Sequence, residues 1–231
     1  MTRSPSGTTE PAADQRRRAS HAVYIDLKRQ ILQLHLAPGA RLVLDDLAER
    51  YSVSAMPIRQ ALTALQLDEL VETEHHRGAR VAPLSVSQLE VIQSVRLGLE
   101  CRLTRLGVQG LGDEQLANMR QQMNVLRRLT DLGDHRGFVE ASWRLRDVLY
   151  SAAGRPQLLA MAVDYRHKYE RYLFALTAPS HLEHHYATFL DLVAACEARD
   201  AATAERITAD SVEWTLARLT TELETHGRFT S

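Results

Sequence analysis

The fold of this chain is decided by one stretch, Leu42-Val43-Leu44-Asp45-Asp46-Leu47-Ala48-Glu49-Arg50-Tyr51-Ser52-Val53-Ser54-Ala55-Met56-Pro57-Ile58-Arg59-Gln60-Ala61-Leu62. In its first part Leu44, Leu47 and Ala48 fall on one face of a helix of period 3.6, and charged residues fall on the other. After the break at Ser52-Val53-Ser54 the same kind of spacing begins again. Two short amphipathic helices joined by a tight turn are therefore predicted.

The second of these helices has a marked start and two distinct faces. Ser54 can cap its N-terminus, and Pro57 falls in its first turn, where a missing N–H does little harm. The apolar residues that repeat at helical spacing are Ile58, Ala61, Leu62 and Leu65. The residues that point away from them are Ala55, Met56, Arg59 and Gln60. We expect this outward face to be the working surface of the domain.

A further amphipathic helix is predicted upstream, from His21 to Leu34, where Pro38-Gly39 soon end the pattern. Residues 1–19 are rich in Ser, Thr, Pro, Ala and Arg and have no apolar period, so we expect a disordered tail. The first helix completes a core of three helices with the two described above.

A β-hairpin is predicted after the third helix. Residues 70–73 and 79–82 have the composition of two short strands, and they enclose Glu74-His75-His76-Arg77-Gly78. Gly78 can adopt positive φ at the tip of this turn. Three helices followed by such a hairpin are typical of a winged helix-turn-helix, which we place at residues 20–83.

The motifs of this region resemble the DNA-binding domain of the GntR family of bacterial transcription regulators. They are Ser-x-x-Pro-x-Arg-x-Ala-Leu from Ser54 to Leu62, then Leu70-Val71, then Arg77-Gly78-x-x-Val81. Upstream, Ile31 and Pro38-Gly39-x-Arg41-Leu42 extend the resemblance, which covers residues 21–83. The resemblance implies that the partner of this domain is a double-stranded DNA operator.

The predicted DNA-binding residues are Ser54, Met56, Arg59, Gln60, Arg77 and Gly78. An outward Arg59 can bind guanine O6 and N7 bidentately in the major groove, while the wing tip could enter the minor groove and Ser54 could bind a phosphate. The family commonly has arginine at the positions of Ala55 and Asp45. Because neither is arginine here, we expect an operator that differs from the usual family sequence.

The second half of the chain, residues 84–231, contains helical patterns with short breaks and no strand pattern. Ser85 and Gln88 form a capping box that opens a long helix reaching about Gly110. Five more helical patterns follow it. The whole chain is therefore predicted to be mainly α, with the winged domain followed by an all-α bundle of six helices.

This half resembles the FCD effector domain of FadR-like GntR regulators, and by its number of helices it is most similar to the six-helix, VanR-like group. The resemblance rests on Arg96-x-x-x-Glu100, on Leu149-Tyr150-x-Ala152-Ala153-Gly154-Arg155-Pro156-x-Leu158-Leu159 and on Ala198-Arg199-Asp200. It implies a homodimer whose effector domain holds a small carboxylate, often on a metal ion. Aligned on these motifs, the family's four metal ligands correspond to Ser142, Arg146, Phe189 and Ser211. Since these are poor ligands, we predict no metal and no cofactor.

Arg146 is the most informative of these replacements, because a guanidinium could bind a carboxylate or phosphate directly through paired hydrogen bonds. The predicted effector-binding residues are Arg96, Trp143, Arg146, Tyr165, Tyr169 and His185. For Arg96 an ion pair with Glu100, one turn on, is equally favoured. The tyrosines could equally be ordinary bundle core.

Three histidines close in sequence suggest a competing function. His181, His184 and His185 have a spacing that metal ligands can adopt, so an all-α metal-dependent enzyme is one alternative. We expect His181 and His184 to be solvated and His185 to be a core or pocket residue. No nucleophile or paired carboxylates accompany them, so we do not expect an enzyme. In a third alternative the bundle serves only for dimerisation.

Composition limits these functions further. The 231 residues are 45% hydrophobic and 25% charged with a net charge of −1, and residues 1–85 carry 11 Lys and Arg against 10 Asp and Glu, so the DNA-binding half is no basic block. Binding should then be modest and salt-sensitive. The run Arg16-Arg17-Arg18 could follow a DNA groove, although a solvated basic segment is favoured. Without a long apolar run or a cysteine pairing pattern, we predict a cytoplasmic protein with no membrane partner. The resemblance to the family implies in addition a repressor that is controlled by a small anionic metabolite.

Overall fold

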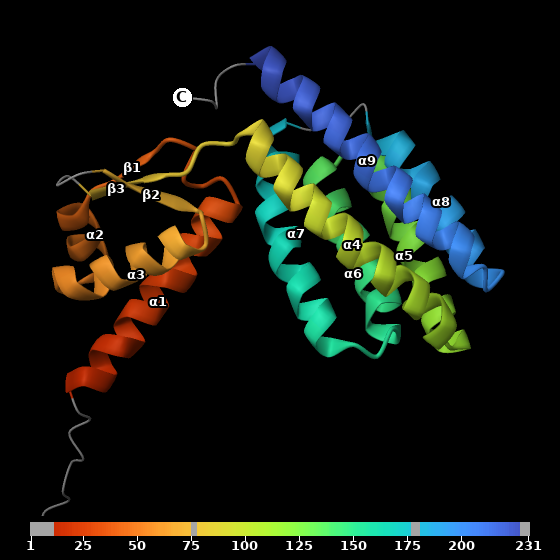
Figure 1. Ribbon diagram of the computed structural model, residues 1–231, viewed down its shortest axis with the longest axis horizontal. Coiled ribbons are helices and arrows are strands. Elements are labelled where there is room, and N and C mark those ends of the chain that lie inside the picture. The colour runs from red at the N-terminus through yellow and green to blue at the C-terminus, as the bar shows by residue number, and fades with distance from the viewer. Residues whose placement is uncertain (1–11, 75–77, 177–180, 227–231) are drawn as a thin grey trace, which may run out of the picture. The chain divides into compact units, whose positions relative to one another are not determined.

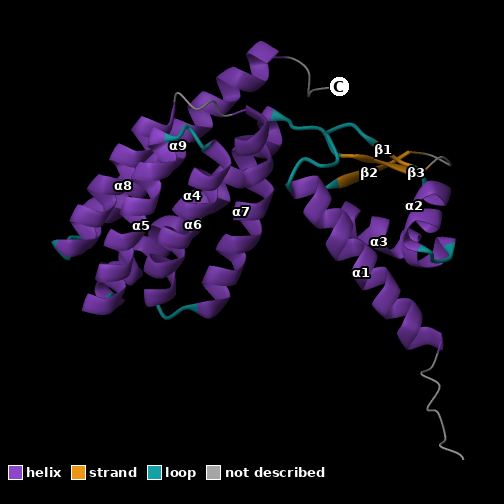
Figure 2. Ribbon diagram, turned by 180° about the vertical axis from the view of Figure 1, so that it is seen from behind, coloured by secondary structure: helices purple, strands orange, loops and turns teal. Residues whose placement is uncertain are grey.

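The computed structural model describes residues 12–74, 78–176 and 181–226 (Figures 1 and 2). The chain divides into two compact units, residues 1–83 and 84–231. The described residues are mainly helical with one small sheet, which confirms the predicted fold class. In that part of the chain, no helix has the length and apolar composition needed to cross a membrane.

The first unit has the elements of a winged helix-turn-helix. Its elements are α1 (Ala12–Leu32), β1 (Arg41–Leu42), α2 (Leu44–Tyr51), α3 (Ala55–Leu67), β2 (Val71–Glu74) and β3 (Gly78–Val81). The sheet has the order β1-β3-β2, and both pairings are antiparallel. In the β2–β3 hairpin, Val71 lies opposite Val81 and Glu74 lies opposite Gly78. The predicted wing is therefore present.

The core of this unit orients α3. Side chains from α1, α3 and the strands bury one another completely or nearly so: Val23, Leu27, Ile31, Ile58, Ala61, Leu65, Val71 and Val81. At the end of α2, Ser52 adopts the left-handed conformation, with φ of 51°, and this reverses the chain toward α3. Ser54 is the N-cap residue, as predicted, but its hydroxyl makes no capping hydrogen bond.

The predicted start of the first helix is wrong. The helix α1 begins at Ala12 rather than at His21, so residues 12–19, which we expected to be disordered, are helical. The segment contains Ala, Gln and Arg, which favour helix, and it continues upstream from Val23, whose side chain is anchored in the core. Residues 1–11 lie outside the described part.

The described residues of the second unit form six helices, the number predicted. They are α4 (Val86–Gly110), α5 (Asp113–Asp131), α6 (His135–Ala152), α7 (Pro156–Leu176), α8 (Leu182–Glu197) and α9 (Ala201–His226). Side chains cap the N-termini of α4, α6 and α9, the last through Asp200, which accepts from the backbone N–H of Thr203 at 3.0 Å. Ser85 Oγ accepts a hydrogen bond from the backbone N–H of Gln88 at 3.2 Å, and Asp134 accepts one from Gly137 at 2.9 Å.

Helix α4 packs against α6, α7 and α9 (Figure 1). Its crossing with α6 is close because two glycines of α4 leave no side chain between the helices. A Cβ atom on Gly107 would collide with the carbonyl oxygen of Leu149, and one on Gly110 with that of Ala152. The crossing brings the middle of α4 against α6, where the polar residues described below lie.

Candidate functional site

The outward face of α3 is the first candidate surface. Arg59, Gln60 and Thr63 are exposed, and Met56 is 56% exposed, while Ala55 is half-buried. Arg59 therefore points away from the core, as its helical position predicts. Whether it binds a base is a separate prediction, taken up under the proposed function.

The other predicted DNA contacts flank this face in sequence. Ser54 is exposed at the start of α3. Gly78 is the first residue of β3 and pairs with Glu74 in the hairpin. Arg77 lies outside the described residues.

Two side-chain hydrogen bonds hold α1 to the other helices of the first unit. The Tyr51 hydroxyl donates to Asp26 at 2.7 Å, and the Tyr24 hydroxyl donates to Asp68 at 2.6 Å. The hydrogen bond from Tyr51 lowers the pKa of Asp26, whereas burial and that carboxylate raise the pKa of Tyr51 to about 12. These ties fix α1 to the end of α2 and to the C-cap of α3. Sequence reasoning did not identify them, because each partner is at least 25 residues away.

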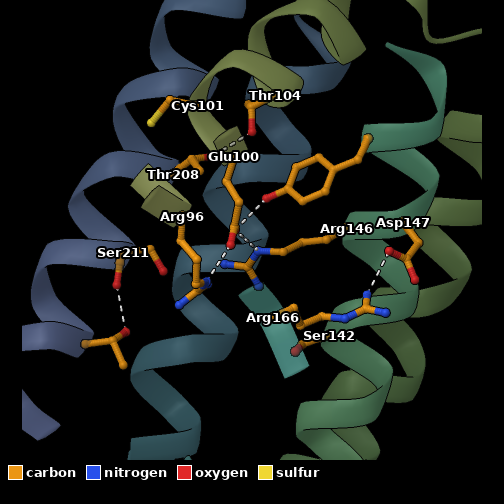
Figure 3. Close-up of polar contacts among 12 residues, drawn as sticks. Arg96, Glu100, Cys101, Thr104, Ser142, Arg146, Asp147, Arg166, Thr208 and Ser211 are labelled. Atoms are coloured by element: carbon orange, nitrogen blue, oxygen red, sulfur yellow. Dashed lines mark hydrogen bonds and ion pairs between the residues drawn. The ribbon is translucent and has the colours of Figure 1, made fainter. Parts of the chain in front are cut away.

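In the second unit, a buried carboxylate lies between two guanidinium groups (Figure 3). Glu100 is 1% exposed, and its Oε1 accepts from Arg96 Nε at 2.7 Å. Its Oε2 accepts from the Tyr150 hydroxyl at 2.8 Å and lies 3.7 Å from Arg146 Nε. Helices α4 and α6 supply all four side chains. Arg96 therefore makes the ion pair with Glu100 that was one of its two predicted roles.

The charge state of this cluster follows from its contacts. Burial alone would raise the pKa of Glu100, but the charges of Arg96 and Arg146 and the hydrogen bond from Tyr150 bring it below its usual value. Burial and the nearby Glu100 raise the pKa of Tyr150 well above normal. At neutral pH the cluster thus holds two positive charges and one negative charge.

A cavity of about 40 Å³ adjoins the cluster, enclosed by α4, α6, α7, α8 and α9. Five of the six predicted effector-binding residues line it: Arg96, Trp143, Arg146, Tyr169 and His185. The sixth, Tyr165, is not among the residues that line this cavity. Tyr165 lies one turn before Tyr169 on α7 and packs, half-buried, against the apolar core.

The four positions that correspond to the family's metal ligands also line this cavity: Ser142, Arg146, Phe189 and Ser211. Their chemistry does not fit a metal ion. The Ser142 hydroxyl donates to the carbonyl of Val139 at 2.8 Å, and Phe189 has no donor atom. Within residues 12–74, 78–176 and 181–226, no three His, Cys, Asp or Glu side chains are grouped so that they could hold an ion.

Arg146 places a buried positive charge at the position where the family has a metal ligand. Its side chain is 8% exposed, and its guanidinium lies 4.4 Å from the ring centroid of Phe189 and 5.3 Å from that of Trp143. Among the described residues, neither Arg146 Nε nor the indole N–H of Trp143 has a hydrogen-bond partner. Two buried donors beside one cavity are the features expected of a site for an anion.

The histidines are placed partly as predicted. His185 lines the cavity, and burial together with the charge of Arg146 lowers its pKa to about 3, so it is neutral. His181 was expected to be solvated but is only 9% exposed, because its Nε2 accepts from Arg218 Nε at 3.0 Å and its ring packs on Trp214. His184 is exposed and stacks on Trp214 with ring centroids 3.9 Å apart.

Two features of the site were not predicted. His135, at the start of α6, also lines the cavity, and burial lowers its pKa. An open groove of about 600 Å³ lies between α8 and α9, lined by Trp214 and His184 among others. Ser211 borders both the groove and the cavity. Both features depend on how distant helices pack, which no local pattern specifies.

A winged helix-turn-helix with an exposed face on α3, followed by a helical domain that contains a cavity with charged and apolar lining residues, is the organisation of a DNA-binding transcription regulator with an effector domain. Comparisons with known proteins agree with this class. Residues 19–81 match the model of the bacterial regulatory proteins of the gntR family, and residues 91–213 match the FCD domain. The chain belongs to the GntR family of transcription regulators and contains an FCD domain.

Individual relatives have the same organisation. The HTH-type transcriptional regulator McbR of Escherichia coli is 28% identical over 178 residues, which are 76% of this chain and 80% of McbR. The HTH-type transcriptional repressor GlaR of the same species is 28% identical over 191 residues, 78% of this chain and 86% of GlaR. The solved structure of E. coli McbR/YncC has a TM-score of 0.73 at 26% identity and covers 88% of this chain and 97% of that one. The predicted family and the prediction that the chain is a regulator rather than an enzyme are confirmed.

Proposed function

We propose that this regulator is a homodimeric repressor that releases its operator, or binds it more tightly, when a small carboxylate or phosphate occupies the cavity beside Arg146. The observation that carries the proposal is the buried guanidinium of Arg146, whose Nε has no hydrogen-bond partner within the described residues. A buried charge in that situation is costly unless a counter-ion or a ligand completes its contacts.

The charges of the cluster support an anionic ligand. Glu100 is already bonded to Arg96 and Tyr150 at under 3 Å, whereas its distance to Arg146 Nε is 3.7 Å. One positive charge therefore exceeds what Glu100 can neutralise. An oxyanion in the cavity could accept from Arg146 and from the indole N–H of Trp143. The volume of about 40 Å³ suits a compact ligand, since a water molecule needs roughly 10–15 Å³ on the same measure.

The DNA side of the proposal concerns α3 and the wing. Arg59 would bind a guanine edge in the major groove, and the further contacts would be Ser54, Met56, Gln60, Arg77 and Gly78. A homodimer would present two such heads to a two-fold symmetric operator. The repressor assignment takes support from GlaR, which is named as a repressor.

A route from ligand to DNA runs through α4. An anion that draws Arg146 away from Glu100 would change the contact between α6 and α4. Helix α4 begins at Val86, only a few residues after β3 ends at Val81, so a shift of α4 acts on a short connection to the head. In this scheme the ligand selects one of two arrangements by binding it more tightly.

The proposal is tested by screening the full chain for thermal stabilisation with inorganic phosphate and with small mono- and dicarboxylates. A ligand at about 100 times its Kd should stabilise the fold by about 2.7 kcal/mol. Arg146→Gln should abolish the response. Arg144→Gln, which removes an exposed arginine from the same helix, should retain it. The active compound should also change the affinity for DNA from the region upstream of the protein's own gene.

Two other outcomes would redirect the assignment. If no anion acts on the wild type while the purified bundle remains dimeric, the second unit serves for dimerisation alone. Metal analysis of the purified protein provides the second check. A stoichiometric transition metal would contradict the interpretation of Ser142, Arg146, Phe189 and Ser211 as a site that holds no ion.

A further inference from the structure

Helix α1 carries a basic segment that lies outside the region matched to the DNA-binding family. The family match begins at residue 19, whereas α1 begins at Ala12. The helical residues before the match include Arg16, Arg17 and Arg18, all of them exposed, and Asp14 as the one acidic side chain. The helix thus extends a strongly basic surface beyond the part of the chain that matches the family.

This segment borders the recognition helix. A surface groove of about 650 Å³ is lined by Ala64 of α3 and, on α1, by Asp14, Arg17, Arg18, Ser20, His21 and Tyr24. Ala64 is half-buried and lies one turn after Gln60, at the border between the exposed and buried faces of α3. The basic surface of α1 is therefore continuous with the edge of the face that carries Arg59 and Gln60.

The direction of the segment is fixed by its anchor. The Tyr24 hydroxyl donates to Asp68, the C-cap residue of α3, at 2.6 Å, and Lys28 Nζ lies 2.8 Å from the same carboxylate. At 1.5 Å per residue, Arg17 lies about 10 Å along the helix from Tyr24. The major groove is about 12 Å wide, with a phosphate backbone along each side. Measured along α1, the basic segment thus lies close to one groove width from the point where α1 is bonded to α3.

Packing in the hydrophobic core does not account for the three arginines. The first residue of α1 in the hydrophobic core is Val23, downstream of all of them.

We infer that Arg16, Arg17 and Arg18 form a second DNA contact, which binds phosphates of the backbone that flanks the major groove occupied by α3. The inference rests on the proposed placement of α3 in that groove. It adds affinity that is independent of sequence, because phosphate contacts carry no base information. It also explains how a domain without a large net positive charge holds DNA, since the charge is concentrated beside the reading face.

The test measures the affinity of the full chain for two duplexes as salt is raised from about 50 to about 200 mM. One duplex carries the footprinted sequence upstream of the protein's own gene, and the other is unrelated DNA of equal length. The variants are Arg16→Gln, Arg17→Gln and Arg18→Gln combined, and the same three positions changed to Lys. The matched control combines Arg102→Gln, Arg144→Gln and Arg155→Gln, three exposed arginines of the second unit.

The slope of log affinity against log salt should fall by about 0.9 for each phosphate that the Gln variant no longer neutralises. Its affinity at low salt should fall on the order of tenfold or more, by the same factor for both duplexes. The Lys variant and the control should retain the wild-type slope. Arg59→Ala should instead lose the preference for the footprinted duplex, while its slope should differ from that of the wild type by no more than about one. If Arg59→Ala keeps the preference, the proposed placement of α3 in the major groove fails, and this result is distinct from a failure of the arginine contact.

Two results would overturn the inference. One is a wild-type slope in the Gln variant; if the same variant loses binding to anionic phospholipid vesicles, the segment binds a membrane surface and not DNA. The other is an equal fall in the control, because the effect would then reflect net charge and not the position of α1.

Discussion

Arg146 on α6 and Glu100 on α4 face each other with Nε and Oε2 3.7 Å apart, and both side chains are more than nine-tenths buried. The separation is too long for a hydrogen bond, although Glu100 makes short hydrogen bonds to Arg96 and Tyr150. Glu100 thus neutralises one arginine closely and the other only at a distance.

Glu100→Gln should destabilise the second unit, because it leaves two buried guanidinium groups without a carboxylate. Removing one partner of a buried ion pair costs about 3–5 kcal/mol. Urea unfolding of the wild type and variant measures the change. The control is Glu205→Gln, whose partner Arg105 is exposed, and its effect should stay below about 1 kcal/mol. Equal losses in the two variants would show that Glu100 has no special place in the cluster.

Arg59→Ala should reduce discrimination between operator and unrelated DNA by about 1–3 kcal/mol, since the variant cannot bind guanine bidentately. The side chain is exposed and outside the core, so thermal stability should hardly change. Gln66→Ala, which removes an exposed residue near the other end of α3, is the control and should leave discrimination intact. If Arg59→Ala binds the operator like the wild type, α3 does not read bases through this residue.

The glycine at the α4–α6 crossing should be irreplaceable, unlike a glycine elsewhere on the same helix. Gly107→Ala places a methyl group against the carbonyl oxygen of Leu149 and should cost about 1–3 kcal/mol or more. Gly98→Ala meets open space and should stabilise by up to about 1 kcal/mol through helix propensity. Both are measured by chemical unfolding. If Gly107→Ala leaves the free energy of unfolding unchanged, α4 and α6 can move apart without loss of stability.

The half-buried His185 should make stability fall in acid. Burial and the charge of Arg146 lower its pKa to about 3 from an ordinary value of 6.5, so below pH 6.5 the unfolded chain binds a proton that the folded chain does not. Stability therefore rises with pH between these values, and near pH 5 the folded state loses on the order of 2 kcal/mol through this residue. His185→Gln should become more stable relative to the wild type as the pH falls.

Glu170 should act in the opposite direction. Its burial raises the pKa to about 7 from 4.5, so the folded chain binds the extra proton and stability falls as pH rises between these values. In the wild type, the pH dependence of stability due to Glu170 partly cancels that due to His185 in the pH range where both groups titrate. Glu170→Gln should thus lose stability relative to the wild type as the pH falls through this range. Parallel pH profiles for both variants and the wild type would refute the assignment.

The parts of the fold that could be predicted were those set by local periodicity. The exposed position of Arg59 follows from the apolar stripe of its own helix, and the capping role of Ser85 follows from residues one turn apart. The start of α1 was missed because a polar, arginine-rich segment has no apolar period, even though its residues favour helix once Val23 is anchored.

The cavity could be predicted only in part. Alignment on motifs brought Arg146 and Ser211 to one site, and the structure places both beside one cavity. Position on a helix did not separate Tyr169 from Tyr165, because residues one turn apart share a face and the exact rotation of α7 decides which one borders the cavity. The burial of His181 was not predicted for a similar reason, since the ring that packs against it, Trp214, comes from another helix.

The two tyrosine hydrogen bonds of the first unit have a consequence for its motion. Asp26 of α1 accepts from Tyr51 at the end of α2, and Tyr24 of α1 donates to Asp68 at the C-cap of α3, so side-chain hydrogen bonds connect α1 to both other helices of the first unit. We therefore expect α1, α2 and α3 to move together whenever the first unit is displaced, since any change of shape between them would have to break one of these hydrogen bonds.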